Sequence, residues 1–190
     1  MDGIKICEWT NEIPFEAIHD VLVAAHANSN VEFDTTNLTC DELNDRLTNG
    51  GTVFIAMDGE RVVGTMTVCT EHKKMWYANG VVARLRFLAV HPEYAGRHIA
   101  SKLVDACAQR AKEQGITTLL WTTAANNSAA IATSKKNSFI LVDYHHFARL
   151  NHDSVSLVRW KNLSWLSAFR AKVYYTLRRE KILLKRSFRP

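Results

Sequence analysis

The residues best suited to binding chemistry lie between Phe87 and Ala100, in the sequence FLAVHPEYAGRHIA. The stretch reads as an apolar strand, a turn marked by proline, a loop of small residues and the start of an amphipathic helix. A helix that begins where a strand ends presents free backbone N–H groups and the positive end of its dipole together. Because such a terminus binds anions, the spacing predicts a phosphate-bearing ligand at Gly96 to Ser101.

The composition is that of a globular protein. The chain has 190 residues, of which 47% are hydrophobic and 23% are charged, and it contains no apolar run long enough to cross a membrane. Its N-terminal residues are too polar for a secretory signal. The four cysteines are widely spaced and form no CxxC pair. We therefore expect reduced thiols in a cytosolic protein.

The net charge of +5 is unevenly distributed. Residues 161–190 hold nine Lys or Arg residues and a single acid, Glu180, for a charge of +8, and the remainder carries −3. Any electrostatic role therefore belongs to the C-terminal segment. We divide the chain into a domain over residues 1–160 and a basic amphipathic tail over residues 161–190.

Hydrophobic periodicity predicts the elements that position the anion site. Strands are predicted at residues 4–9, 52–57, 61–70, 80–90, 117–123, 139–147 and 154–160. Helices are predicted at residues 13–27, 97–114 and 127–137, with a shorter one from about Thr39 to Gly50. Asp58-Gly59 marks a tight hairpin turn. This order predicts an α/β fold, with a mixed central sheet and helices on both faces.

Two sequence patterns resemble those of the GNAT superfamily of acyl-CoA N-acyltransferases, with a match over roughly residues 4–160. One pattern is an apolar strand ending in V-x-P, followed by R/Q-x-x-G-x-G/A and a helix. It is matched by Val90-His91-Pro92, Tyr94, Gly96, Ile99, Ala100 and Ser101. The second, N-x-x-A-x-x-x-Y-x-x-x-G-F, keeps its register at Asn127, Ala130 and Phe139. Two patterns with the expected elements between them are strong evidence for the resemblance.

The resemblance implies that the protein binds acetyl-CoA as a cosubstrate. Backbone amides of the loop and the helix start would hold the pyrophosphate, over Ala95, Gly96, Arg97, His98, Ile99, Ala100 and Ser101. The exposed strand edge at Leu88, Ala89 and Val90 would pair with the pantetheine, and an amide there would polarise the thioester carbonyl. Asn127 would lie near the pantetheine and the acyl end.

Some residues depart from the family pattern. Ala95 replaces Arg or Gln, and His98 replaces the middle glycine, where a left-handed conformation would cost about 1 kcal/mol or more. The His98 side chain either adds a phosphate donor or points to solvent. Ser134 replaces a tyrosine that often protonates the departing thiolate; it either orders a water or is simply a small polar helix residue. Because a thiol has a pKa near ~8.5, its thiolate leaves tolerably without an acid. Ser138 replaces a glycine, which affects the helix end more than the chemistry.

Arg84 and Arg86 stand where many relatives place an acidic residue. Alternation along the strand places Arg84, Arg86 and Leu88 on one face. The other face then carries Leu85, Phe87 and Ala89. The two arginines either clamp a carboxylate or phosphate on the acceptor amine, or pair with Glu71 or other acids on neighbouring strands.

The general base is open between several candidates. It must accept a proton from the ammonium group of the acceptor and works best with a pKa near ambient pH. Glu71 is the first candidate and His145 the second, while His72 and His146 lie beside them. Each is also readable as a surface or packing residue. The histidine spacing predicts no metal site.

The tail has the pattern of a basic amphipathic helix. Leu166, Phe169, Val173 and Leu177 recur at helical spacing among Lys and Arg residues, and Ser164 is a candidate N-cap. Such a helix can dock on the domain or on a second subunit, or lie on an anionic membrane surface. Its arginines form no base-reading pattern, so we do not expect specific nucleic-acid binding. We expect a cytoplasmic protein, with homodimerisation and contact with the inner membrane surface left open.

These features predict transfer of an acetyl group from acetyl-CoA to a primary amine, by direct attack in a ternary complex. The acceptor would be a small molecule or sugar amine, negatively charged if the two arginines bind it, and a protein N-terminus or lysine stays open. The alternative is a CoA-binding module without turnover, which acts as a sensor or assembly partner tethered by its tail. Ala95, His98 and Ser134 favour that alternative.

Overall fold

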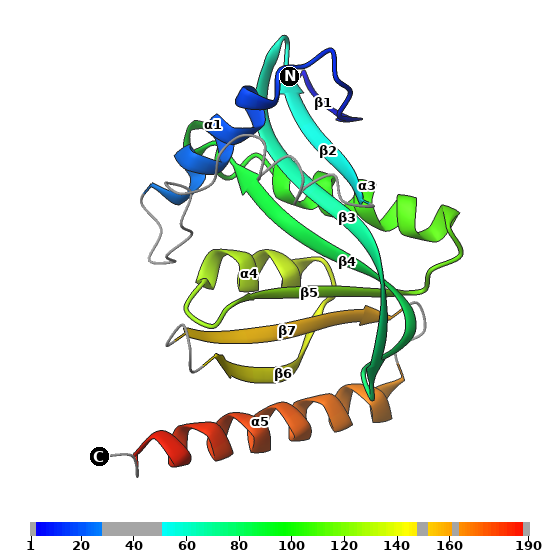
Figure 1. The fold of residues 1–190 in the computed structure, drawn as a ribbon, viewed down its shortest axis with the longest axis vertical. Helices are drawn as coiled ribbons and strands as arrows, with labels where there is room; N and C mark the ends of the chain where they lie inside the picture. The colour runs from blue at the N-terminus through cyan, green and yellow to red at the C-terminus, as the bar shows by residue number, and fades with distance from the viewer. Residues whose placement is uncertain (1–2, 28–50, 148–151, 161–163, 188–190) are drawn as a thin grey trace.

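The computed structural model describes residues 3–27, 51–147, 152–160 and 164–187, and the strands within them form one sheet (Figure 1). The strand order is β1-β2-β3-β4-β5-β7-β6. The strands are β1 (Ile4–Glu8), β2 (Gly51–Asp58), β3 (Arg61–Met75), β4 (Ala78–Val90), β5 (Thr118–Ala124), β6 (Ile140–Phe147) and β7 (His152–Trp160). The helices are α1 (Phe15–His26), α3 (Ile99–Glu113), α4 (Ser128–Lys136) and α5 (Trp165–Ser187), with a 3-10 turn, η1, at Pro92–Tyr94. The predicted helix from Thr39 to Gly50 lies outside the described residues.

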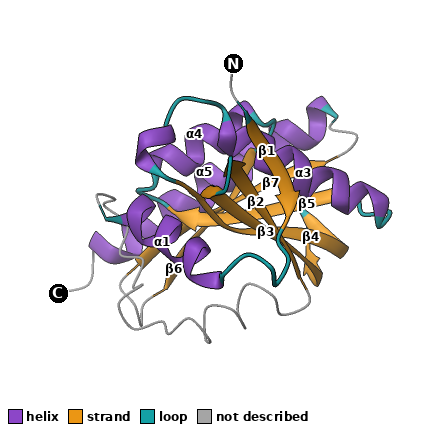
Figure 2. Ribbon diagram, turned by 90° about the horizontal axis from the view of Figure 1, so that it is seen from above, coloured by secondary structure: helices purple, strands orange, loops and turns teal. Residues whose placement is uncertain are grey.

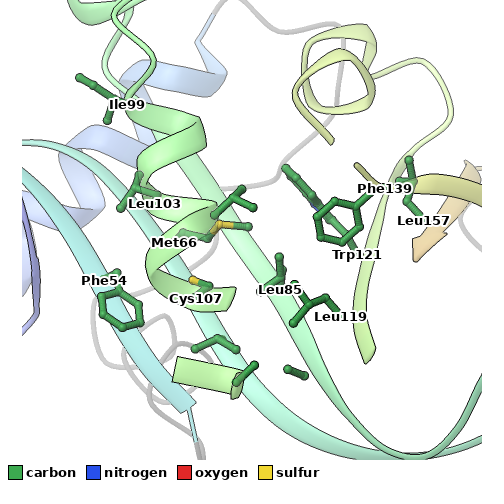
Figure 3. Close-up of a cluster of buried hydrophobic side chains, with 14 of the residues drawn as sticks. Phe54, Met66, Leu85, Ile99, Leu103, Cys107, Leu119, Trp121, Phe139 and Leu157 are labelled. Carbon is green, nitrogen blue, oxygen red and sulfur yellow. The ribbon is translucent and has the colours of Figure 1, made fainter. Parts of the chain in front are cut away.

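Helices cover both faces of the sheet (Figure 2). Alternate side chains of β2 point to opposite faces. Ile55 packs in a cluster with Leu22 of α1, whereas Ala56 packs in a cluster with Leu103 of α3. Figure 3 shows the second cluster, which includes Leu103 and Cys107 of α3 and, farther along the sheet, Trp121 of β5 beside Phe139. The predicted α/β fold with a mixed sheet is confirmed.

A β-bulge in β4 makes part of the predicted alternation wrong. Thr65 of β3 pairs with Ala89 and Thr67 pairs with Arg86, so β4 carries one extra residue between these pairs. Phe87 lies in the bulge with a φ of 52°. The extra residue shifts the pleat by one position. Ala89 therefore packs in the cluster around α1, although Leu85 packs in the cluster around α3.

The bulge also separates Leu88 from the arginines with which alternation grouped it. Leu88 packs against the cluster around α3, as Leu85 does. Before the bulge, Arg84 and Arg86 alternate with Leu85, so they project from the opposite face of the strand. The two arginines therefore share a face with each other, as predicted, but not with Leu88.

The centre of the sheet opens between β4 and β5. These parallel strands pair only over Ala83–Leu85 and Leu119–Trp121, and Figure 1 shows them running apart beyond that point. β4 continues to Val90 with β3 on one side. On its other side, no described strand pairs with it beyond Leu85. Among the residues that the structure describes, a strand edge is thus left open in the middle of the sheet.

The C-terminal helix α5 lies along β6, the edge strand farthest from β1 in the sheet (Figure 1). Its N-terminus is capped as predicted, since the Ser167 N–H donates to Ser164 Oγ at 3.1 Å. Ala171 is fully buried against a cluster that includes Val142 and Val158. The helix therefore docks on the domain. Within the described residues no helix is long and apolar enough to cross a membrane.

The docked face of α5 is not the one that the sequence periodicity selected. The residues packed against the domain are Ala171, Tyr175 and Ile182. The residues whose spacing predicts the apolar face are exposed: Leu166, Phe169, Val173 and Leu177. The helix is apolar on two sides, so periodicity alone could not tell which side would be buried.

Candidate functional site

The loop before α3 is held in place by Tyr94. The Tyr94 hydroxyl donates to Asp58 Oδ2 at 2.8 Å, at the turn between β2 and β3. The guanidinium groups of Arg61 and Arg97 lie over the Tyr94 ring, 5.6 and 4.9 Å from its centroid. Gly96 has a φ of 80°, which favours glycine. These contacts fix the path of the chain into α3.

The N-terminus of α3 is open for an anion. His98 is the N-cap residue, in the left-handed conformation with φ 60° and ψ 15°, and no side chain caps the helix. The first N–H groups of a helix, here those of Ile99, Ala100 and Ser101, have no acceptor within it. The His98 side chain is exposed. An exposed side chain leaves these amides accessible to a phosphate and fits either alternative for His98, a phosphate donor or a side chain at the solvent.

Two adjoining cavities continue from this helix terminus into the opening between β4 and β5. The outer cavity has a volume of about 220 Å³ and is lined by Ala100 and Thr133 and by the β4 edge at Leu88, Ala89 and Val90. The inner cavity has a volume of about 300 Å³ and is lined by residues of β4 from Arg84 to Leu88 and of β5 from Trp121 to Ala124. Together they form a cleft from α3 into the centre of the sheet.

Leu88 and Asn127 line both cavities. Asn127 is also the N-cap of α4, because its Oδ1 accepts from the Ala130 N–H at 3.0 Å. Its side chain is thus fixed at the point where the two cavities meet. The structure therefore brings Ala100, Asn127 and the predicted strand-edge residues together around one cleft.

The two arginines of the inner cavity have different partners. Arg84 Nη1 lies 3.2 Å from Glu71 Oε2, and Lys73 Nζ lies 2.7 Å from the same oxygen. Arg84 therefore follows the alternative in which an acid on the neighbouring strand neutralises it. Arg86 is exposed, and its guanidinium lies 6.0 Å from the centroid of the Phe87 ring. Among the described residues, Arg86 takes part in no ion pair.

Glu71 is held as an anion. Burial alone would raise its pKa, but the hydrogen bond from Lys73 and the charge of Arg84 outweigh burial and hold the pKa below its usual value. A lowered pKa weakens a general base at neutral pH. Glu71 also lies within β3, which runs on to Met75 rather than ending at Thr70 as predicted. It does not line either cavity.

Ser134 and His145, the other two catalytic candidates, also lie away from both cavities. Ser134 is fully buried in α4, where its hydroxyl donates to the Ile131 carbonyl at 2.8 Å. His145 Nε2 lies 3.1 Å from Ser156 Oγ and 3.5 Å from Asp143 Oδ2. Arg178 of α5 contacts the same Asp143, which places His145 beside the docked tail.

Two histidines of the cleft were missed by sequence reasoning. His26, the last residue of α1, lines both cavities, and its Nδ1 lies 2.7 Å from the Leu22 carbonyl. His152, the first residue of β7, lines the inner cavity. They come from segments more than 120 residues apart, so no local pattern connects them. The one local signal is that each stands at the end of an element.

Cys69 lies opposite Arg84 in the pairing of β3 with β4. Its thiol donates to the Arg84 carbonyl at 3.6 Å. Burial raises the pKa of Cys69, and the nearby Arg86 only partly offsets this effect. Because the thiolate is the reactive form, this thiol is poorly suited to attack a thioester. Within the described residues, no group of three or more His, Cys, Asp or Glu residues is arranged to hold a metal ion.

Comparison with known families assigns the chain that forms this cleft to one of them. A model of the acetyltransferase (GNAT) family matches residues 8–139. The chain belongs to the GNAT acetyltransferase family. The match includes the α3 terminus, both walls of the cleft and Asn127, which agrees with the resemblance found in the sequence.

Solved structures share the GNAT fold of this chain. An N-acetyltransferase from Staphylococcus aureus Mu50 is 20% identical, with a TM-score of 0.65 over 84% of this chain and 99% of that one. A GNAT family acetyltransferase from Elizabethkingia anophelis with acetyl-CoA bound is 17% identical, with a TM-score of 0.62 over 84% and 99%. The ribosomal-protein-S18-alanine N-acetyltransferase from Escherichia coli is 15% identical, with a TM-score of 0.62 over 85% and 96%. No curated protein sequence matches this GNAT chain.

Proposed function

We propose that the protein transfers an acetyl group from acetyl-CoA to the amine of a negatively charged small molecule, within a ternary complex. One observation carries this proposal. A continuous cleft leads from the open N-terminus of α3, along the unpaired edge of β4, to an inner cavity that holds Arg86.

The residues present fit acetyl-CoA. The amides of Ile99, Ala100 and Ser101 would bind its pyrophosphate, because neither a side-chain cap nor the His98 side chain blocks them. The open β4 edge from Leu88 to Val90 would accept the pantetheine as an additional strand. Acetyl-CoA would supply the acetyl group, activated as a thioester. The structure of a family member with acetyl-CoA bound supports this choice of cosubstrate.

The chain would promote the transfer mainly by positioning and electrostatics. Backbone N–H groups of the β4 edge would stabilise negative charge on the carbonyl oxygen of the acetyl group. Arg86 would bind the anionic group of the acceptor and so hold its amine in the inner cavity. The ammonium proton must leave before the amine can attack. His26 and His152 line the inner cavity whereas Glu71 does not, so either histidine suits this role better than Glu71.

A CoA-binding module without turnover is the competing account. It is favoured by Ser134, whose hydroxyl is already bonded to a helix carbonyl and lies away from both cavities. The two accounts share cofactor binding and differ in turnover. Detection of an acetylated amine product separates them, whereas release of free CoA by hydrolysis would not.

The acceptor charge is tested with glucosamine 6-phosphate and glucosamine, which differ only by a phosphate. We expect kcat/KM to be about tenfold or more higher for the phosphorylated amine, as one charge-assisted hydrogen bond would provide. The Arg86→Glu variant should lose this preference, and the matched Arg86→Lys variant should keep most of it. Equal rates for both amines in the parent protein would refute an anionic acceptor. No acetylated product from a broad set of amines would favour the binding module.

A further inference from the structure

Helix α5 carries an apolar stripe on the side that faces away from the domain, continuous from Leu166 to Leu177 and resumed at Leu184 after the turn that holds Glu180. The stripe consists of Leu166, Phe169, Val173, Leu177 and Leu184, all exposed. Leu177 is 67% exposed, and Trp165, at the start of the helix, is 79% exposed. Spacings of three, four and seven residues place these side chains on one helix face. The contiguous exposed row from Leu166 to Leu177 marks an interaction surface.

The domain already occupies the opposite side of the helix. Ala171 is fully buried, and Tyr175 and Ile182 pack against the core. At 100° per residue, Ala171 lies about 160° around the helix from Val173, and Ile182 lies about 160° from Leu184. The tail is therefore fixed by one face and presents the other outward along about 34 Å of helix. Figure 1 shows α5 along one side of the molecule, with the rest of the fold on its other side.

The charges that remain around the stripe are positive. Three arginines of α5 are engaged with the domain: Arg170 lies over the Trp76 ring at 4.8 Å, Arg178 pairs with Asp143, and Arg186 pairs with Asp153. Lys172, Lys181 and Lys185 are exposed and belong to no ion pair among the described residues. The one acid in the helix sequence, Glu180, lies 3.3 Å from Arg179. Apart from Glu180, which lies on the stripe's own face between Leu177 and Leu184, the charges beside the stripe are basic.

We propose that α5 docks on an anionic membrane surface, with the stripe among the acyl chains and the lysines at the phosphate headgroups. A helix with an apolar face bordered by Lys and Arg lies in the plane of such an interface. Charge complementarity selects this occupant over a second copy of the chain. A symmetric pair of α5 helices would bring two sets of lysines together, because an isologous contact joins identical patches. This proposal concerns where the protein acts and is independent of its reaction.

The test is sedimentation of the full-length protein with sucrose-loaded vesicles. Vesicles of phosphatidylcholine alone are compared with vesicles of phosphatidylcholine and phosphatidylglycerol. We expect binding to the anionic vesicles at least about tenfold tighter than to the neutral ones, and weaker binding in high salt, as basic residues near a charged surface predict. Equal affinity for both vesicle types, or no binding to either, would overturn the proposal.

Two sets of variants locate the contact. Phe169→Ser with Leu177→Ser removes apolar area from the stripe, and Lys172→Glu with Lys181→Glu reverses its border. Each should reduce binding to anionic vesicles about tenfold or more. Val81→Ser is the matched control, because Val81 is an exposed apolar residue on β4 and its loss should leave binding unchanged. Unaltered circular dichroism shows that the variants fold.

Self-association is the outcome that would assign the stripe to a second copy. It would appear as a concentration-dependent dimer in sedimentation equilibrium that Phe169→Ser with Leu177→Ser abolishes, together with no vesicle binding. Acetylation of a water-soluble amine is measured alongside. Turnover without vesicle binding rejects the membrane proposal alone. Vesicle binding without turnover rejects the proposed reaction alone.

Discussion

At the scale of single residues, Glu71 shows how the sheet fixes a charge. Its carboxylate forms ion pairs with Lys73 on its own strand and with Arg84 on the neighbouring strand, and its side chain is 22% exposed. The two cations lower its pKa despite partial burial. Its role in the structure is therefore to neutralise Arg84 beside the inner cavity, whereas Arg86 takes part in no ion pair among the described residues.

The lowered pKa of Glu71 predicts a pH dependence of stability. A carboxyl group whose folded pKa is depressed contributes stability that is fully present above the unfolded value, here 4.5, and is lost as the pH falls through the folded pKa. At pH 7, Glu71→Gln should lower the free energy of unfolding by about 1 kcal/mol. The deficit should shrink well below pH 4.5.

Urea denaturation of the parent and the variant, at pH 7 and at a pH well below 4.5, measures this difference in the free energy of unfolding. Glu60→Gln serves as the control, because Glu60 is exposed at the turn between β2 and β3. That variant should change stability little at either pH. A deficit for Glu71→Gln that is the same at both pH values would show that the carboxylate charge is not the cause.

At the scale of elements, the end of α4 shows how a departure from the family pattern is tolerated. The Phe139 N–H donates to the Ser134 carbonyl at 3.0 Å and the Ser138 N–H to the Lys135 carbonyl at 3.1 Å. These two bonds form a Schellman motif, with Ser138 in the left-handed position at a φ of 64°. Glycine usually stands there because it has no Cβ.

Replacing Ser138 by glycine should therefore stabilise the protein. We expect the free energy of unfolding to rise by about 0.5–1 kcal/mol, because a left-handed non-glycine residue is strained. Ala95→Gly is the matched control: Ala95 has a φ of −59°, so glycine there only loosens the unfolded chain and should be neutral or destabilising. Chemical denaturation measures both variants. Lower stability for Ser138→Gly would contradict the account of the helix end.

Elements marked by local chemistry were predictable from the sequence. Asp58-Gly59 located the hairpin, Ser164 located the start of α5, and the small-residue loop located the start of α3. The β4 bulge was not predictable, because an aromatic residue such as Phe87 gives no local signal for a φ of 52°. The bulge is compatible with packing on both faces, since Leu88 meets the α3 cluster and Ala89 the α1 cluster.

The candidate site was predictable where one segment builds it. The β4 edge, the α3 terminus and Asn127 are contiguous or lie in recognisable motifs, and the structure brings them to one cleft. His26 and His152 join that cleft only through the tertiary fold. The same limit applies to Glu71 and His145, whose partners on neighbouring strands and on α5 decide their environment.

At the scale of the whole molecule, the cleft lies where two neighbouring described strands share the fewest residue pairs. β4 and β5 are joined through three residue pairs, with α3 packed on the β1–β4 half and α4 following β5. A ligand in the cleft would contact both halves. Because a ligand that binds only the folded state stabilises it, acetyl-CoA should also protect the protein against unfolding.

The central claim is that the α3 terminus and the adjoining cleft bind acetyl-CoA. Isothermal titration with acetyl-CoA tests it, using the parent protein and two variants that each add one negative charge to α3. Ala100→Glu places the charge at the anion site, and Gln109→Glu places it farther along the helix, where Gln109 is exposed. We expect 1:1 binding by the parent and by Gln109→Glu, and affinity at least about tenfold lower for Ala100→Glu. No binding by the parent protein at millimolar ligand, or equal affinity in all three, would contradict the claim.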